Sequence, residues 1–306
     1  MPAWQASRIA KTLPDRWDSY AGEIREGAAF SLLSLFRLGG QEVAVKELVY
    51  PREGNTKNLA VDLYSLGTEV ERPCVVVVHG GGWNNGDRKE IASFNHWLAN
   101  RGYAVASIEY RLAPENVWPA PLRDLEAAVK YLKSNADQLG IDRTRIALFG
   151  RSAGGQIVTA AASSPEFSEI RGAIAFYAPH DLEFAWAFGD EDDVLNSLDL
   201  LRNYMGGEPG TVPANYQSAS AYLQEDGALR RVPTLLVHGA NDTLVWVEQS
   251  RRYSERLVQA GAKSFYLELP WATHGFEFNQ NGPAGQLALY SVERFLACEF
   301  ACESSD

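Results

Sequence analysis

The sequence predicts an α/β fold built on a mostly parallel, doubly wound sheet of about eight strands. From residue 74 onward, short apolar segments alternate with longer amphipathic ones. Such alternation is typical of parallel strands joined by right-handed helical crossovers. Residues 74–78 (CVVVV) also form a continuous apolar run rich in β-branched side chains, which indicates a strand buried on both faces.

The length and composition favour one folded unit. A chain of 306 residues with 46% hydrophobic and 22% charged residues can build a single large core. Because α/β folds of this length often form one unit, we expect a single domain over residues 1–306. Residues 1–40 are interpreted as an N-terminal cap segment, and residues 180–227 as a cap or lid insertion.

The first elements are predicted from local patterns. Residues 30–36 (FSLLSLF) have the spacing of a short amphipathic helix, which we expect to cover the domain or a pocket. Residues 42–50 and 58–64 alternate between apolar and polar side chains, and a turn signal at 51–54 (PREG) separates them. These two segments predict a hairpin of antiparallel edge strands.

The later elements follow in regular order along the chain. We expect helices at residues 90–100, 122–134, 153–162, 247–260 and 284–300. We expect strands at residues 103–108, 145–149, 173–177, 234–238 and 265–269.

The stretch 180–227 interrupts this alternation. It is too long for a plain connection, and its aromatic side chains, Phe184, Trp186 and Phe188 among them, are too apolar for a disordered segment. We therefore expect a cap or lid. Its acidic run at 190–193 (DEDD) lacks the spacing of a cation site and is interpreted as a solvated loop, so no metal is expected.

Charge and cysteine content limit the partners and the location. The net charge of -11, without a cluster of Lys and Arg, disfavours nucleic acids and anionic membranes as partners. The apolar runs are shorter than the roughly 20 residues that span a bilayer, and the N-terminus lacks a signal-peptide pattern. An odd number of cysteines, with Cys74 inside an apolar run, predicts reduced thiols and a cytoplasmic location. A homodimer is left open.

Residues 150–154 (GRSAG) fall where a predicted strand ends and a helix of small residues begins. The two glycines let the chain turn sharply while the serine hydroxyl stays exposed in a strained conformation. The positive end of the helix dipole favours an anion that develops at this point. We therefore expect Ser152 to act as a nucleophile.

A second glycine-rich segment, residues 79–83 (HGGGW), follows the buried strand directly. Consecutive glycines let backbone N–H groups approach a substrate oxygen closely, as an oxyanion hole requires. We expect Gly81 and Gly82, together with Ala153 after the nucleophile, to donate these hydrogen bonds.

A serine hydroxyl needs a histidine to accept its proton and a carboxylate to orient that histidine. His274 and Asp242 both lie on loops that follow late strands, where open α/β sheets place their ligands. The chain order Ser152, Asp242, His274 is also the order expected for such a triad. The other histidines, His79, His96, His180 and His238, are interpreted as structural.

Several aromatic residues are candidates for the wall of a substrate pocket. Trp83, Trp186 and Phe276 are predicted to line the substrate pocket, with Trp118 and Trp246 as further candidates. For each of them an ordinary place in the core is the alternative.

From residue 50 onward the chain resembles the hormone-sensitive-lipase-like carboxylesterases and the related BD-FAE-type esterases of the α/β-hydrolase superfamily. The segments that carry the resemblance are HGGG at 79–82, YRLAPE at 110–115, GRSAGG at 150–155, and the loops of Asp242 and His274. Arg151 stands where the hormone-sensitive branch usually has Asp, and HGGGW followed by Gly86 and Asp87 is closer to the BD-FAE type. The resemblance implies the α/β-hydrolase fold, hydrolysis of esters with short or medium acyl chains, and no cofactor.

Two other functions are weighed against ester hydrolysis. The same triad could cleave amides, as in arylformamidases, but the corresponding loop of that family usually has Tyr where this chain has Gly82. A catalytically silent binding module is the second alternative. Such modules typically lack a member of the triad, whereas Ser152, Asp242 and His274 are all present.

Overall fold

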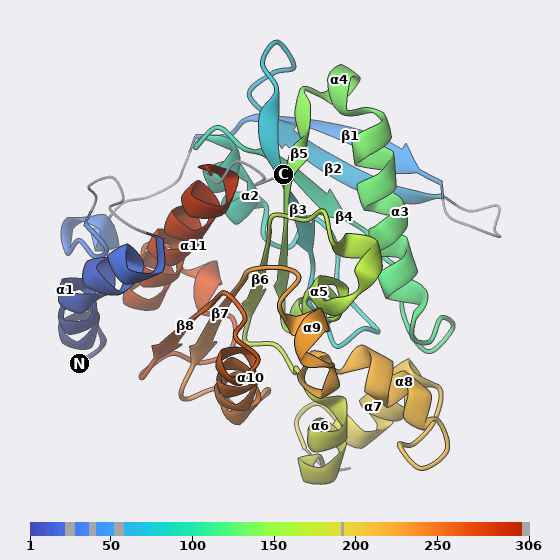
Figure 1. The fold of residues 1–306 in the computed structure, drawn as a ribbon. Coiled ribbons are helices and arrows are strands. Elements are labelled where there is room, and N and C mark those ends of the chain that lie inside the picture. Colours follow the sequence, from blue (N-terminus) through green and yellow to red (C-terminus); the bar gives the residue numbers. More distant parts are fainter. Residues whose placement is uncertain (22–27, 37–40, 52–57, 191–192, 302–306) are drawn as a thin grey trace.

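The computed structural model describes residues 1–21, 28–36, 41–51, 58–190 and 193–301, and all structural statements refer to these residues. Eight strands form one sheet in the order β1-β2-β4-β3-β5-β6-β7-β8 (Figure 1). The strands are β1 (Ala44–Tyr50), β2 (Leu59–Ser65), β3 (Arg72–Val78), β4 (Ala104–Ile108), β5 (Ile141–Arg151), β6 (Gly172–Phe176), β7 (Thr234–Gly239) and β8 (Ser264–Leu269).

The sheet is parallel except at one edge. β2 pairs antiparallel with both β1 and β4, and each of the other neighbouring pairs is parallel. The prediction of a mostly parallel sheet of about eight strands is therefore confirmed, as is the antiparallel pairing of its first two strands, although of these two only β1 lies at the edge. Most of the predicted turn between β1 and β2 lies outside the described residues.

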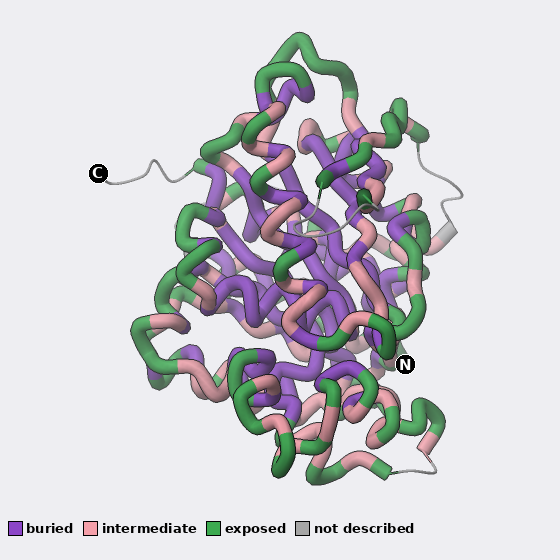
Figure 2. The backbone as a smooth tube through the Cα atoms, turned by 90° about the vertical axis from the view of Figure 1, so that its right-hand side faces the viewer, coloured by how far each residue is buried: buried purple, intermediate pink, exposed green. Residues whose placement is uncertain are grey.

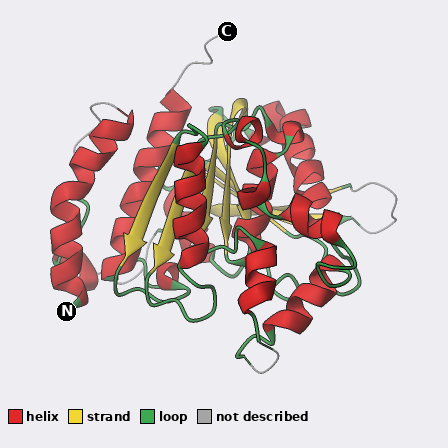
Figure 3. Ribbon diagram, turned by 60° about the horizontal axis from the view of Figure 1, so that its bottom comes forward, coloured by secondary structure: helices red, strands yellow, loops and turns green. Residues whose placement is uncertain are grey.

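Helices cover both faces of the sheet (Figure 3). One face carries α3 (Ala120–Ser134), α5 (Ala153–Ser163) and α10 (Glu248–Gln259), and the other carries α2 (Ala92–Ala99) and α11 (Pro283–Ala301). The remaining helices are α1 (Pro2–Ala21), α4 (Ala136–Leu139), α6 (Leu182–Phe188), α7 (Ser197–Met205), α8 (Pro213–Ala219) and α9 (Asp226–Leu229), with short 3-10 helices at Leu33–Phe36, Pro165–Phe167, Ala221–Leu223 and Phe276–Phe278.

The side chains of the central strands pack into the core on both faces of the sheet. On β3, Val76 and Val78 pack into the cluster under α3 and α5, whereas Val75 and Val77 pack into the cluster under α2 and α11. All four side chains are fully buried, so β3 is a strand buried on both faces, as its continuous apolar run predicts. Figure 2 shows the same distribution, with buried segments in the interior and exposed ones outside.

The register of β3 and β5 positions the two glycine-rich segments. Val78, the last residue of β3, pairs with Gly150 near the end of β5. Because the two strands are parallel, the loops that follow them leave the same edge of the sheet side by side. Residues 79–83 and 150–154, about seventy residues apart in the sequence, therefore meet at this edge.

The N-terminal segment differs from the prediction. Residues 2–21 form α1, which packs against α11 and buries Ala6, Leu13 and Trp17. The Trp17 ring stacks on Phe265 of β8 with ring centroids 3.9 Å apart. These contacts hold α1 against α11 and the edge strand β8, and the interpretation of residues 1–40 as a cap segment stays a prediction. The predicted helix at 30–36 is reduced to the 3-10 helix Leu33–Phe36.

The insertion between β6 and β7 is helical rather than irregular. It contains α6, α7, α8 and α9, which lie together beyond the edge of the sheet where β5 and β6 end (Figure 1). Its α6 contacts both α7 and α8, so the insertion packs partly on itself. In the described part of the chain, no helix combines the length and the apolar character that a membrane span requires.

Candidate active site

Ser152 lies in the sharp turn between β5 and α5. Its backbone has φ +52°, a conformation that non-glycine residues rarely adopt. A Cβ atom on Gly150 would lie 2.3 Å from the Gly154 carbonyl oxygen, and one on Gly154 would lie 2.3 Å from the Val78 and His79 carbonyl oxygens. Both flanking positions therefore require glycine, because the turn and the neighbouring loop leave no room for a side chain.

Three side chains from three loops meet at this turn. The Oγ of Ser152 lies 3.0 Å from the Nε2 of His274, and the Nδ1 of His274 lies 2.7 Å from the Oδ2 of Asp242. A carboxylate only accepts hydrogen bonds, so Nδ1 carries the proton of a neutral His274 and Nε2 is left to accept the serine proton. The structure thus brings together the three residues that the sequence predicts to act as nucleophile, base and acid.

Both oxygens of the Asp242 carboxylate accept hydrogen bonds. Its Oδ1 accepts hydrogen bonds from the backbone N–H groups of Leu244 and Val245, both at 2.9 Å. Burial alone would raise the pKa of Asp242, but hydrogen bonds from His238 and His274 outweigh burial and hold this pKa well below its usual value. Asp242 is therefore ionised at neutral pH, as an orienting acid requires.

Two of the three predicted oxyanion donors lie beside Ser152. Gly82 and Ala153 line the cavity together with Ser152, and Ala153 is the first residue of α5, where backbone N–H groups have no partner within the helix. Gly81 lies behind them, and its carbonyl accepts from the Asn85 N–H at 3.0 Å. A Cβ atom on Gly81 would lie 2.2 Å from the Asn85 oxygen, so this turn needs glycine as well.

His79 fixes the glycine-rich loop from inside. Its Nδ1 lies 2.8 Å from the Gly80 carbonyl oxygen, and its ring stacks on Tyr110 with centroids 4.2 Å apart. The Tyr110 hydroxyl donates to the His79 carbonyl at 3.1 Å. Burial lowers the pKa of His79 to about 4, despite the hydrogen bond to Gly80. His79 is thus neutral at pH 7 and has the structural place that the sequence predicts.

Trp83 connects this loop to the helical insertion. Its ring stacks on Tyr204 of α7 with centroids 4.4 Å apart. Its Nε1 donates to the Oε1 of Gln156 at 2.9 Å, and the Tyr204 hydroxyl donates to the same oxygen at 2.9 Å. The buried side-chain amide of Gln156 on α5 therefore accepts hydrogen bonds both from residues 79–83, which we call the oxyanion loop, and from α7.

A buried ionic cluster lies beside the nucleophile, and it is absent from the sequence-based prediction. The guanidinium of Arg151 pairs with Glu90 and lies 3.7 Å from a carboxylate oxygen of Glu277. The Tyr177 hydroxyl donates to that same oxygen of Glu277, and the Tyr177 ring lies 4.3 Å from the His274 ring. The cluster thus joins the residue before Ser152 to the loop that carries His274.

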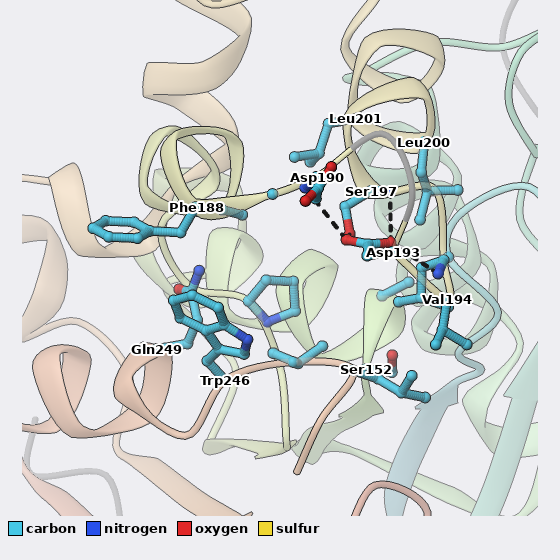
Figure 4. Close-up of a pocket in the computed structure, with 18 of the residues that line it drawn as sticks. Ser152, Phe188, Asp190, Asp193, Val194, Ser197, Leu200, Leu201, Trp246 and Gln249 are labelled. Atoms are coloured by element: carbon cyan, nitrogen blue, oxygen red, sulfur yellow. Dashed lines mark hydrogen bonds between the residues drawn. The ribbon is translucent and has the colours of Figure 1, made fainter.

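A cavity of about 530 Å³ opens beside Ser152 (Figure 4). The core supplies Ser152, Ala153 and residues 243–246, and the insertion supplies residues from α6, α7 and the connection between them. Ser152 lies toward one end of the cavity in Figure 4, and Phe188 and Trp246 lie toward the other. Most of the lining is apolar, and Asp190 and Asp193 are its acidic side chains.

The aromatic residues are only partly where the sequence predicts them. Trp83 and Trp246 line the cavity, whereas Trp186, Phe276 and Trp118 do not. Trp186 points to the other side of α6, where its ring lies 6.3 Å from Tyr216. Phe276 packs into the core under α11, and Trp118 is buried with its Nε1 donating to Ser218. These three predictions are corrected, since packing against neighbouring helices sets the side-chain directions.

The acidic run of the insertion has a local role where it is described. Asp193 accepts hydrogen bonds from the backbone N–H groups of Leu195 and Ser197, at 2.9 and 3.0 Å, and so shapes the start of α7. Residues 191 and 192 lie outside the described residues. Within the described ranges, no three His, Cys, Asp or Glu side chains form a group suited to a metal ion.

Comparisons with known proteins agree with this arrangement. The BD-FAE family model matches residues 61–257. The probable carboxylic ester hydrolase LipM of Mycobacterium tuberculosis is 29% identical over 95% of this chain and 70% of its own length. Esterase LipC of the same organism is 28% identical over 73% of this chain and 58% of its own length.

Solved structures show a similar arrangement of the chain. A bacterial heroin esterase covers 96% of this chain and 92% of its own with a TM-score of 0.72 and 24% identity. An esterase from Rhizomucor miehei covers 97% of this chain and 91% of its own with a TM-score of 0.74 and 21% identity. At these identities the likeness concerns the fold, which is that of the α/β-hydrolases.

The burial of His79 predicts how the free energy of unfolding depends on pH. In the unfolded chain His79 binds a proton near pH 6.5, whereas in the folded chain it does so only near pH 4. Between these values the unfolded state binds more protons, so the free energy of unfolding falls as the pH falls. The difference of roughly 2.5 pKa units corresponds to about 3 kcal/mol.

The variant His79→Asn retains a side-chain donor for the Gly80 carbonyl but cannot be protonated in this range. Urea unfolding at pH 7, 5.5 and 4.5 should show a smaller loss of stability for this variant than for the wild type. Parallel losses in the two proteins would contradict the role assigned to His79.

Proposed function

The chain belongs to the BD-FAE family and is a carboxylic ester hydrolase, and we propose that Ser152, His274 and Asp242 carry out its reaction on neutral esters with short to medium acyl chains. The observation that carries this proposal is the continuous hydrogen-bonded path from the Ser152 hydroxyl through His274 to Asp242. Ser152, at one end of this path, lines a cavity large enough for an acyl group.

In the first half of the reaction, the Ser152 oxygen attacks the ester carbonyl carbon while its proton passes to the Nε2 of His274. The carbonyl oxygen becomes an anion, which the N–H groups of Gly81, Gly82 and Ala153 stabilise. The tetrahedral intermediate collapses, the bond to the alcohol oxygen breaks, and the leaving alkoxide takes the proton from His274. Ser152 is then acylated and the alcohol departs.

In the second half, His274 takes a proton from a water molecule that attacks the acyl carbonyl. Collapse of the second intermediate breaks the bond to the Ser152 oxygen, which recovers its proton from His274. The products are one carboxylic acid and the free enzyme. Throughout, the charge of Asp242 stabilises the transient imidazolium of His274 and fixes its ring.

The lining of the cavity supports neutral esters as substrates. Among the described residues that line it, none is Lys, Arg or His, while Asp190 and Asp193 bring negative charge to one wall. A substrate with its own carboxylate would be repelled there, whereas alkyl and aryl groups can pack on Phe184, Leu200 and Trp246.

The surroundings of Gly82 support ester over amide hydrolysis of the arylformamidase type. Gly82 has φ +59°, and a Cβ atom on it would lie 3.1 Å from a methyl group of Leu200 on α7. The Tyr that arylformamidase-like proteins usually have at this position would therefore need a different placement of the insertion. A silent binding module would not need the hydrogen bonds that join Ser152, His274 and Asp242.

Other features stay predictions. We propose a cytoplasmic location, in which the thiol of Cys74, fully buried on β3, remains reduced. We also propose a single domain with the 180–227 insertion as a cap, no cofactor and no nucleic-acid partner; a homodimer is left open.

The nucleophile is tested by rates on nitrophenyl esters from acetate to palmitate, with an aryl formamide included. We expect the wild type to cleave the shorter esters, and Ser152→Ala to lower kcat on the order of 10⁶-fold. Asp242→Asn should lower kcat on the order of 10⁴-fold, because His274 loses its orienting carboxylate.

The exposed Ser168 supplies the control Ser168→Ala, which should match the wild type. Full activity of purified Ser152→Ala would remove the assignment, and a preference for the formamide would favour the amidase.

The cavity is tested by filling it from α6. Ala185→Phe adds a ring to the cavity wall, so kcat/KM for the octanoate ester should fall by roughly tenfold relative to that for the acetate ester. Ala214→Phe places the same ring on the exposed side of α8 and should leave the ratio unchanged. Equal ratios in both variants would show that acyl chains bind elsewhere.

A further inference from the structure

His238 lies behind the acid of the triad. It is the fifth residue of β7 and is fully buried. Its Nε2 lies 3.0 Å from the Val245 carbonyl oxygen and 3.3 Å from the Oδ2 of Asp242. Its Nδ1 lies 2.7 Å from the Oγ of Ser250 on α10. His238 therefore touches Asp242 on the same oxygen that accepts from His274.

The hydrogen bonds of His238 fix the position of its proton. A carbonyl and a carboxylate only accept, so the Nε2 of His238 must carry hydrogen. In the neutral ring, Nδ1 then accepts, and the hydroxyl of Ser250 donates to it. The Ser250 oxygen in turn lies 3.3 Å from the Nε2 of His180. His180 is fully buried, which lowers its pKa well below the ordinary value and keeps it neutral.

Two hydrogens point toward the loop of the catalytic carboxylate. Ser250 donates to the Nδ1 of His238, and the Nε2–H of His238 lies between the Val245 carbonyl oxygen at 3.0 Å and the Oδ2 of Asp242 at 3.3 Å. Ser250 comes from α10, so an element outside the triad loops holds the His238 ring.

We propose that His238 is a positioning residue for ester hydrolysis: its Nε2–H holds the Oδ2 of Asp242 in the orientation that receives the Nδ1–H of His274. The hydroxyl of Ser250 holds His238 in the required tautomer. This proposal rests on the proposed function, since it concerns the same triad. It adds a fourth side chain to the group that sets the geometry and the proton affinity of His274.

The effect of removing this donor can be derived from the surroundings of Asp242. Without His238, Oδ2 has only His274 as a partner, while Oδ1 keeps two backbone donors. More of the negative charge then acts on His274, which should hold its proton more strongly. Because the reaction needs a neutral His274, the acidic limb of the pH profile should move to higher pH.

The other titratable groups that face His238 do not replace this donor. Besides Asp242 and His180, its electrostatic neighbour is Glu268, which pairs with His238 in the register of β7 and β8. The Glu268 carboxylate accepts two hydrogen bonds from Arg251, at 2.7 and 2.8 Å. A carboxylate in this position cannot donate to Asp242, so His238 has no substitute on the neighbouring strand.

The test compares two replacements of one side chain. His238→Phe keeps a ring without a donor, whereas His238→Gln places an amide N–H near the position of Nε2. The measurements are kcat/KM for a nitrophenyl ester from pH 5 to 9 and the thermal unfolding midpoint.

For His238→Phe we expect kcat/KM to fall roughly tenfold and the acidic limb of its pH profile to move upward by about half to one pH unit. His238→Gln should recover most of both changes, and His96→Phe, a histidine on α2 outside the site, should match the wild type.

Two further measurements separate this proposal from the function itself. The proton shared by His274 and Asp242 can be followed by NMR during a pH titration, without turnover and with His274→Ala as the assignment control. If His238→Phe does not fold, Ser250→Ala should move the same titration in the same direction by a smaller amount. A wild-type profile and an unchanged His274 titration in folded His238→Phe would overturn the proposal. An inactive wild type would overturn the proposed function, and the NMR titration would still decide the role of His238.

Discussion

The strained backbone at Ser152 is the constraint on which the rest of the site depends. The turn is tight enough that Gly150 and Gly154 approach each other and the oxyanion loop at distances that exclude a Cβ atom. It holds because β5 lies in the middle of the sheet, paired in parallel with β3 and β6, and because the Ser152 N–H donates to the Phe176 carbonyl at 2.9 Å. A surrounding structure of this kind is what keeps a sparsely populated conformation in place.

From this turn, buried polar contacts extend in three directions. Gln156, one turn along α5, receives hydrogen bonds from the oxyanion loop and from α7, and its own Nε2 donates to the Ala219 carbonyl of α8 at 2.8 Å. Arg151 reaches Glu90 and Glu277 on the opposite side. Behind His274, Asp242 is held by its own loop and by His238. Ser152, His274 and the helical insertion are thus positioned by side chains behind them, and such satisfied networks favour one arrangement over many.

The sequence was informative wherever a local pattern has a single physical solution. A β-branched run buried on both faces could only be a central strand, and GRSAG after such a strand could only form a tight turn, so the sheet and Ser152 were predictable. Contacts between residues far apart in the sequence could not be predicted in this way. Arg151 lacks a visible partner until the fold brings Glu90 and Glu277 to it, and His238 gains its role only beside Asp242 and Ser250. Likewise, Trp186 and Phe276 were assigned to the cavity by proximity in sequence, whereas helix packing turns them away. The helix α1 was missed because its few buried side chains are widely spaced and a proline lies inside it.

The central claim is that one serine, activated by His274, forms a covalent intermediate. The most direct measurement is treatment with diisopropyl fluorophosphate followed by intact mass and peptide mapping, since this reagent traps an activated serine without turnover. We expect one adduct per chain, located on Ser152, and a much slower reaction in His274→Ala. An adduct on another residue, or hydrolysis of esters that continues undiminished after complete labelling, would contradict it.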